Sequence, residues 1–169
     1  MGLFDKVKGF LNVGGVTVKI TKLENPYPAG DTAMSGDFRL TSDSDRTVLS
    51  TSARFYKKIT SKGQDGQQKA ETHTLGSCST KDYLLNDDYP FEIAKGESKD
   101  LSFLMINVDC PPSLAASSGV TGAIGKMAAF ASKMSGEKVE FFVEVTADVK
   151  GTPFDPSDTV QIQVIEKKS

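Results

Sequence analysis

The sequence contains no tryptophan, one histidine and two cysteines, and it has no long uninterrupted run of apolar residues. Cys78 and Cys110 are too few for a disulfide framework, and with one histidine they do not supply the four ligands of a structural zinc site. No apolar run reaches the roughly 18 residues that a membrane-spanning helix requires. These shortages argue against a disulfide-stapled, zinc-stabilised or membrane-spanning protein.

The chain also lacks an excess of charge of either sign. Its 20 basic and 22 acidic residues give a formal net charge of -2, so no net positive field would concentrate nucleic acid or anionic lipid. The first residues show neither the long apolar segment nor the cleavage site of a secretory signal. We therefore expect a cytoplasmic protein with both thiols reduced and no binding to nucleic acid.

Sequence signatures of catalysis and of cofactor binding are missing as well. The chain has no Gly-Lys-Ser phosphate loop, no Gly-x-Ser-x-Gly elbow and no dinucleotide-binding glycine pattern. His73 lies in a threonine-rich stretch five residues before Cys78, and two positions so close on one strand rarely give the geometry of a catalytic Cys-His pair. We therefore expect no enzymatic activity and no cofactor.

What the chain does contain is alternation of apolar and polar residues with a period of two. Between residues 139 and 149 one parity carries Val139, Phe141, Val143, Val145, Ala147 and Val149. Phe142 alone breaks the pattern. After a turn-forming run at 151–158 the alternation resumes with Val160, Ile162 and Val164. Two antiparallel strands with one buried face need a second covering layer, which predicts an all-β sandwich.

Further strands are predicted over residues 16–21, 36–40, 47–59, 69–80, 89–93 and 101–108, with a loop at 25–31. In the strand 47–59 we expect these residues to face the core: Leu49, Thr51, Ala53, Phe55 and Ile59. Both faces of 101–108 carry apolar residues, so both are expected to be covered. Length favours one domain, an immunoglobulin-like antiparallel sandwich of about seven to eight strands over residues 15–169.

Two amphipathic helices are expected beside the strands. Residues 1–14 place Leu3, Phe4, Val7, Phe10 and Leu11 at helical spacing, and an insertion at 114–135 does the same with Ile124, Met127 and Phe130. We expect both apolar stripes to pack on the sandwich. The alternatives are a weak membrane contact for the first helix and a partner contact for the second.

Acidic residues gather in the predicted loops at strand ends: Asp43, Asp45, Asp87, Asp88, Asp155 and Asp158. A sandwich can bring several loops to one end, where carboxylate oxygens would suit calcium. Aspartate in turns also bonds its own backbone, which explains such residues without a metal. Calcium binding is therefore an alternative rather than the leading expectation.

Several segments, in this order along the chain, resemble arrestin-like N-domains, and the bacterial sporulation-control proteins most closely. Residues 27–31 followed by Gly36 are similar to the loop before the second strand, and residues 89–93 with Gly96-Glu97 are similar to the mid-domain Pro-Phe-x-Ile-Pro motif. Residues 143–151 with 155–158 look like the closing hairpin. The short apolar and basic segment leading into Gly14-Gly15 also fits. The resemblance touches about half of the chain.

The sequence departs from that family pattern in two places. Ala94 and Lys95 stand where the mid-domain motif favours proline, and the insertion at 114–135 is longer than such domains usually carry. The resemblance implies a single arrestin-like lobe with a scaffolding or regulatory role and no catalysis. Together with the missing signatures, it leads us to expect a β-sandwich that binds protein partners of unknown identity, in an unknown oligomeric state.

Overall fold

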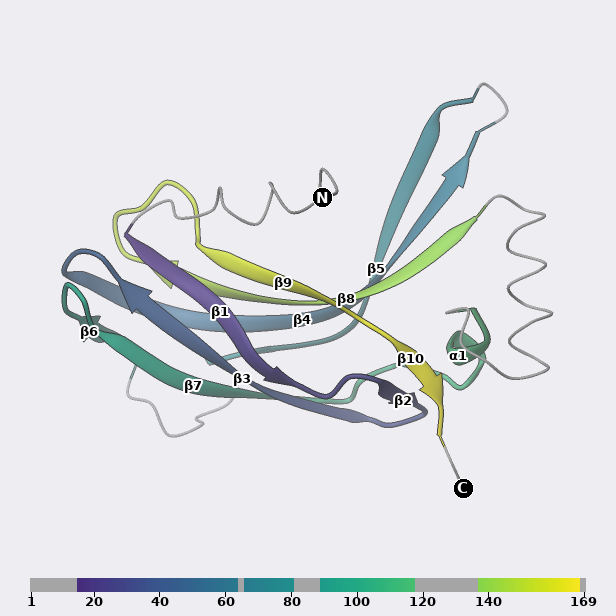
Figure 1. Cartoon of the computed structure of the whole chain (residues 1–169), viewed down its shortest axis with the longest axis horizontal. Helices are drawn as coiled ribbons and strands as arrows, with labels where there is room; N and C mark the ends of the chain where they lie inside the picture. Colours follow the sequence, from purple (N-terminus) through teal and green to yellow (C-terminus); the bar gives the residue numbers. More distant parts are fainter. Residues whose placement is uncertain (1–14, 64–65, 81–88, 118–136, 168–169) are drawn as a thin grey trace.

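The computed structural model describes residues 15–63, 66–80, 89–117 and 137–167, and it confirms an all-β sandwich. In this part of the chain the strands are β1 (Val16–Leu23), β2 (Tyr27–Ala29), β3 (Ala33–Ser42), β4 (Arg46–Lys62), β5 (Gln68–Ser79), β6 (Phe91–Ile93), β7 (Ser98–Ile106), β8 (Lys138–Val149), β9 (Ser157–Ile162) and β10 (Val164–Glu166). A short helix, α1 (Ser113–Ser117), follows β7. Figure 1 shows the strands running along the long axis in two layers.

The two layers are antiparallel sheets of unequal size. One has the order β1-β3-β7, and the other has the order β5-β4-β8-β9 with β6 paired to the first residues of β4. The small parallel pair β10-β2 lies at one end. The predicted pairing of the strand from 139 with the strand from 160 is confirmed, because Val143 opposes Val160 in the β8-β9 ladder.

The alternation in the sequence decides which face of β8 is buried. Phe141, Val143, Val145 and Ala147 are at most 1% exposed, and they pack with core residues of β1, β3, β4 and β7. An apolar side chain removed from water in this way stabilises the fold by about 1.5–3 kcal/mol. The core between the sheets therefore rests on the same residues that carry the period-two pattern.

The predicted core face of β4 is wrong at Leu49, and Ile59 is only partly buried and is not part of the core. Leu49 is 38% exposed, whereas its neighbours Val48 and Ser50 are buried. The β4-β8 register shifts between Val48 and Ser50, so Leu49 is an extra residue that opposes none on β8. A bulge of this kind reverses the alternation across it, and Leu49 turns to solvent while Thr51, Ala53 and Phe55 keep their predicted orientation.

The expectation that both faces of β7 are covered is also wrong for the strand itself. Leu101, Phe103 and Met105 are buried, but Leu104 and Ile106 are 37% and 39% exposed on the outer face. Val108 returns to the core because Asn107, at φ 59°, turns the chain just after the strand. A two-residue period cannot anticipate this reversal, since it depends on a left-handed residue.

The predicted loop at 25–31 contains a strand that the sequence pattern does not show. Its three residues form β2, which pairs in parallel with β10 after the chain leaves β9 at Gln163. Tyr27 is fully buried there, and its hydroxyl group donates to the backbone carbonyl of Asp31 at 2.8 Å. The predicted last strand is thus split between two sheets.

The two predicted helices fall mainly outside the described residues. Of the insertion at 114–135, the structure describes helix α1, in which Ala115 is buried and Leu114 packs against the core. The proposed N-terminal helix at 1–14 lies outside the described residues. The predicted strand 69–80 is confirmed as β5.

Candidate interaction surface

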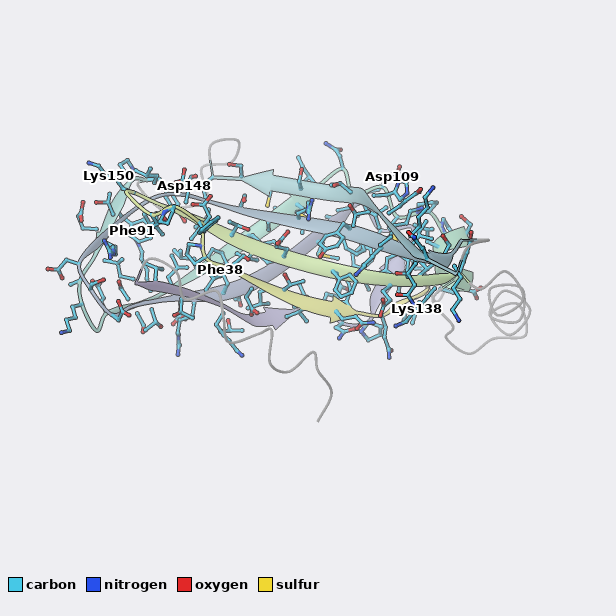
Figure 2. The ribbon with its side chains drawn as sticks, turned by 90° about the horizontal axis from the view of Figure 1, so that it is seen from above. Phe38, Phe91, Asp109, Lys138, Asp148 and Lys150 are labelled. Atoms are coloured by element: carbon cyan, nitrogen blue, oxygen red, sulfur yellow. The ribbon has the colours of Figure 1, made fainter. Side chains whose placement is uncertain are left out.

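The longest hairpin among the described strands, formed by β4 and β5, extends beyond the sandwich. Residues 53 and 55 of β4 are buried, but residues 56–61 are only partly buried and residues 68–74 of β5 are all exposed. We call residues 56–62 together with 68–74 the β-arm. Figure 1 shows the β-arm bending away from the two layers, with the first residues of β8 beside β4. Figure 2 shows Lys138, the first residue of β8, at this end of the protein, whereas Asp148, Lys150 and Phe91 lie toward the opposite end.

An aromatic and arginine cluster lies at the base of the β-arm on its outer face. Tyr56 stacks on Phe142, with ring centroids 5.5 Å apart, and the Arg54 guanidinium lies 4.4 Å from the Tyr56 ring centroid. Arg54 also forms an ion pair with Glu144, with 3.0 Å between Nη2 and Oε2. Partial burial and the nearby Glu144 raise the pKa of Tyr56, while Arg54 acts in the opposite direction. The four side chains form a partly exposed, mutually supported platform.

Sequence reasoning did not assign this cluster, although one signal for it was present. Phe142 breaks the parity of β8 because it faces outward, where its register partner is Tyr56. A large apolar residue on the solvent side of a strand is stabilised by a cross-strand partner. The parity break thus marks the cluster, but its partner on β4 becomes visible only through the register.

The part of the chain that the structure describes offers little enclosed space for a small molecule. A cleft between β4, β5 and β7 has a volume of about 20 Å³ and is lined by residues that include Phe38, Ala53, Cys78 and Leu104. That volume is near the size of one water molecule. Small-molecule pockets usually measure about 300–1,000 Å³.

The acidic loop residues bond the protein's own groups. Asp45 accepts a hydrogen bond from the Lys95 amide at 2.8 Å, Asp158 accepts one from the Ile20 amide at 2.9 Å, and Asp43 accepts one from Ser44. Among the described residues, no three His, Cys, Asp or Glu side chains gather at metal-binding distance. Calcium binding stays a prediction, because Asp87 and Asp88 lie outside the described residues.

The histidine and the cysteines are dispersed. His73 is exposed on the β-arm beside Glu71, with 3.8 Å between Nε2 and Oε2, whereas Cys78 is half-buried nearer the body. Cys110 is buried, and its burial, with a smaller contribution from Asp109, raises the pKa of its thiol to about 11. Cys78 and Cys110, both in the described part of the chain, do not form a disulfide.

The apolar residues predicted to contact a partner or a membrane all lie outside the described residues: Leu3, Phe4, Val7, Phe10, Leu11, Ile124, Met127 and Phe130. Their role stays a prediction. In the described part of the chain, no helix has the length and apolar character needed to span a bilayer.

Two packed antiparallel sheets define the described part of the chain as a β-sandwich, as the sequence predicted. The solved sporulation control protein Spo0M from Bacillus subtilis is similar, with a TM-score of 0.58 and 17% sequence identity. The match covers 92% of this chain and 51% of the Spo0M chain, so this chain spans about half the length of that neighbour. At this identity the likeness establishes the fold. No protein-family model matches the sequence, and no curated protein matches it in sequence.

Proposed function

We propose that this chain is a non-catalytic regulatory or scaffolding module that binds a protein partner through the β-arm and its base. The proposal rests on the extension of β4 and β5 past the core. Residues 68–74 of β5 are all exposed. Ordering the backbone costs about 1–2 kcal/mol per residue, and the outer part of the β-arm returns little apolar burial for it. Structure maintained without a contribution to the core is typical of a binding element.

The chemistry of the β-arm fits a protein surface better than a small substrate. The aromatic pair Tyr56 and Phe142 offers flat apolar area with a cation beside it, and Tyr and Arg are enriched in the residues that dominate protein interfaces. The likeness in fold to a sporulation control protein supports a regulatory role.

The test compares the full chain with a shortened variant. Residues 58–72 are replaced by Asn-Gly, which favours a two-residue hairpin turn between the paired residues Lys57 and His73. We expect the variant to keep a cooperative thermal transition, because no core residue is removed. Affinity capture from the native cell, followed by calorimetry with the purified candidate, should show a stoichiometric partner for the full chain and none for the variant. Equal affinity for both would contradict the role of the β-arm.

A further inference from the structure

Strand β5 forms one edge of the five-stranded sheet, and among the described strands only β4 pairs with it along the β-arm. On the side of β5 that faces away from β4, the Asp109 amide donates to the Leu75 carbonyl at 2.7 Å, close to the two sheets. Beyond that bond, seven consecutive residues of β5 are exposed. An edge of this kind can add a further strand.

The hydrogen-bond pattern shows which groups of β4 turn toward β5. The Thr80 amide donates to the Thr51 carbonyl at 2.9 Å, so the backbone of Thr51 faces the β5 side. From Ser50 to Thr60 the β4-β8 register has no shift. Backbone groups on one side of an antiparallel strand recur at every second residue, so those of Lys57 and Ile59 also face β5.

The same alternation then fixes the free groups of β5. Lys57 and Ile59 oppose His73 and Glu71, whose backbone groups therefore point inward to β4. The amide and carbonyl groups of Ala70, Thr72 and Thr74 point the other way, away from the sheet. A strand laid along this edge would find donors and acceptors at two-residue intervals, in the spacing of an ordinary ladder.

The charge of the β-arm selects what such a strand can be. The β-arm and the residues between its two strands, 56–74, hold four lysines against Asp65 and Glu71, a charge of +2. The whole chain carries -2, so the remainder carries -4. Lys58 and Lys62 lie on β4, one strand away from the edge. They oppose Thr72 and Gln68 of β5. Because Ala70 and Thr72 are small, a lysine side chain can reach across them to an incoming carboxylate. A second copy of the arm would bring like charges together.

We propose that the β5 edge of the β-arm binds an extended, acidic segment of a partner protein as an added strand. This inference rests on the proposed partner-binding function and names the surface and the chemistry of the partner. Backbone hydrogen bonds along Ala70, Thr72 and Thr74 provide the affinity, and the lysines select carboxylate side chains over basic ones.

The probe is a fluorescent ten-residue peptide that alternates Glu and Thr, titrated with the full chain. We expect a rise in anisotropy that weakens several-fold between about 50 and 200 mM salt. The amide signals of residues 68–74 should shift in nuclear magnetic resonance spectra. A peptide that alternates Lys and Thr, and the acidic peptide N-methylated at alternate residues, should each bind at least about tenfold more weakly.

Two variants test the edge itself. Lys58→Glu/Lys62→Glu should weaken binding at least about tenfold, whereas Lys19→Glu/Lys22→Glu, with the same change in net charge on exposed residues of β1, should leave it within about twofold. Thr72→Pro removes one outward amide without removing an amide that bonds β4, so it should abolish binding while the fold persists. Circular dichroism and melting curves confirm folding of each variant.

Several outcomes would overturn the inference. These are no binding of the acidic peptide at millimolar concentration, equal binding by the lysine variants and their control, or signal shifts confined to another element. A Thr72→Pro-sensitive dimer in sedimentation, without peptide binding, would assign the edge to a second copy of the chain. A cellular partner bound equally well by wild type, Lys58→Glu/Lys62→Glu and Thr72→Pro would leave partner binding intact and refute this surface.

Discussion

Replacing Val143 by aspartate tests the packing on which the sandwich rests. Val143 is fully buried between Phe55 on β4 and Val160 on β9. The change removes about 1.5–3 kcal/mol of apolar burial. It also leaves a carboxyl group without a partner, which costs about 1–3 kcal/mol even when the group is uncharged. The expected total of about 2.5–6 kcal/mol approaches the whole stability of many domains, which is about 5–15 kcal/mol.

Two matched variants separate the causes of that loss. Val143→Thr keeps the shape and replaces one methyl group by a hydroxyl group, so it should cost clearly less than Val143→Asp. Glu144→Ala changes the next residue on the solvent side, where it removes a partly exposed ion pair with Arg54, and it should cost at most about 1 kcal/mol. Urea unfolding monitored by circular dichroism measures all three free energies of unfolding.

The pH dependence gives a second test of the same argument. Burial disfavours the ionised carboxylate, so the pKa of the introduced aspartate should be raised above its unfolded value of about 3.9. The deficit relative to wild type should therefore be largest at neutral pH and smaller as the pH falls through the raised pKa. Equal free energies of unfolding for Val143→Asp and Glu144→Ala at pH 7 would refute the assignment of the core face.

Three further changes test other parts of the fold. Asp158→Ala should cost about 1–3 kcal/mol in urea unfolding because it leaves the Ile20 amide without its acceptor, and Asp158→Asn, which keeps an oxygen there, should cost less; equal costs would argue against this bond. Alkylation at pH 8, monitored by mass spectrometry, should modify Cys78 well before Cys110, and comparable alkylation rates would contradict the burial of Cys110. The free energy of unfolding should decline as the pH rises from about 9 toward the Cys110 pKa of about 11. Gly36→Ala should cost about 1–3 kcal/mol, because its Cβ would lie 2.6 Å from a phenylalanine ring carbon and 2.9 Å from a β1 carbonyl oxygen; an unchanged melting temperature would show that β7 yields there.

The sequence was sufficient for the sandwich because alternation reports burial directly. The strand from 139 to 149 has five consecutive buried positions on the predicted parity, from Phe141 to Val149. The pattern failed where the backbone departs from a regular strand. Leu49 lies on the predicted parity, but the bulge beside it turns the side chain to solvent. Such an irregularity depends on the partner strand and leaves no local trace in composition.

Non-local pairing was the second feature that the sequence could not supply. β2 has only three residues and pairs with β10, so neither strand shows enough alternation to be recognised alone. Strands at 47–59 and 69–80 were predicted, but the extension of this pair past the core was not. The strand order is also needed to relate four lysines to an open sheet edge: Lys57, Lys58, Lys62 and Lys69.

The order in which the strands pair has a consequence for synthesis of the protein. The Asn25 side chain binds the Gln163 amide and the Ile20 amide binds Asp158, each across 138 residues of chain. Strands β1 and β2 therefore leave the ribosome long before β9 and β10, which complete their surroundings. Contacts of such long range are slow to form, and unpaired strands invite association with other chains. During translation, β1 and β2 are made before β9 and β10 can pack beside them, so we expect chaperones to bind these first strands.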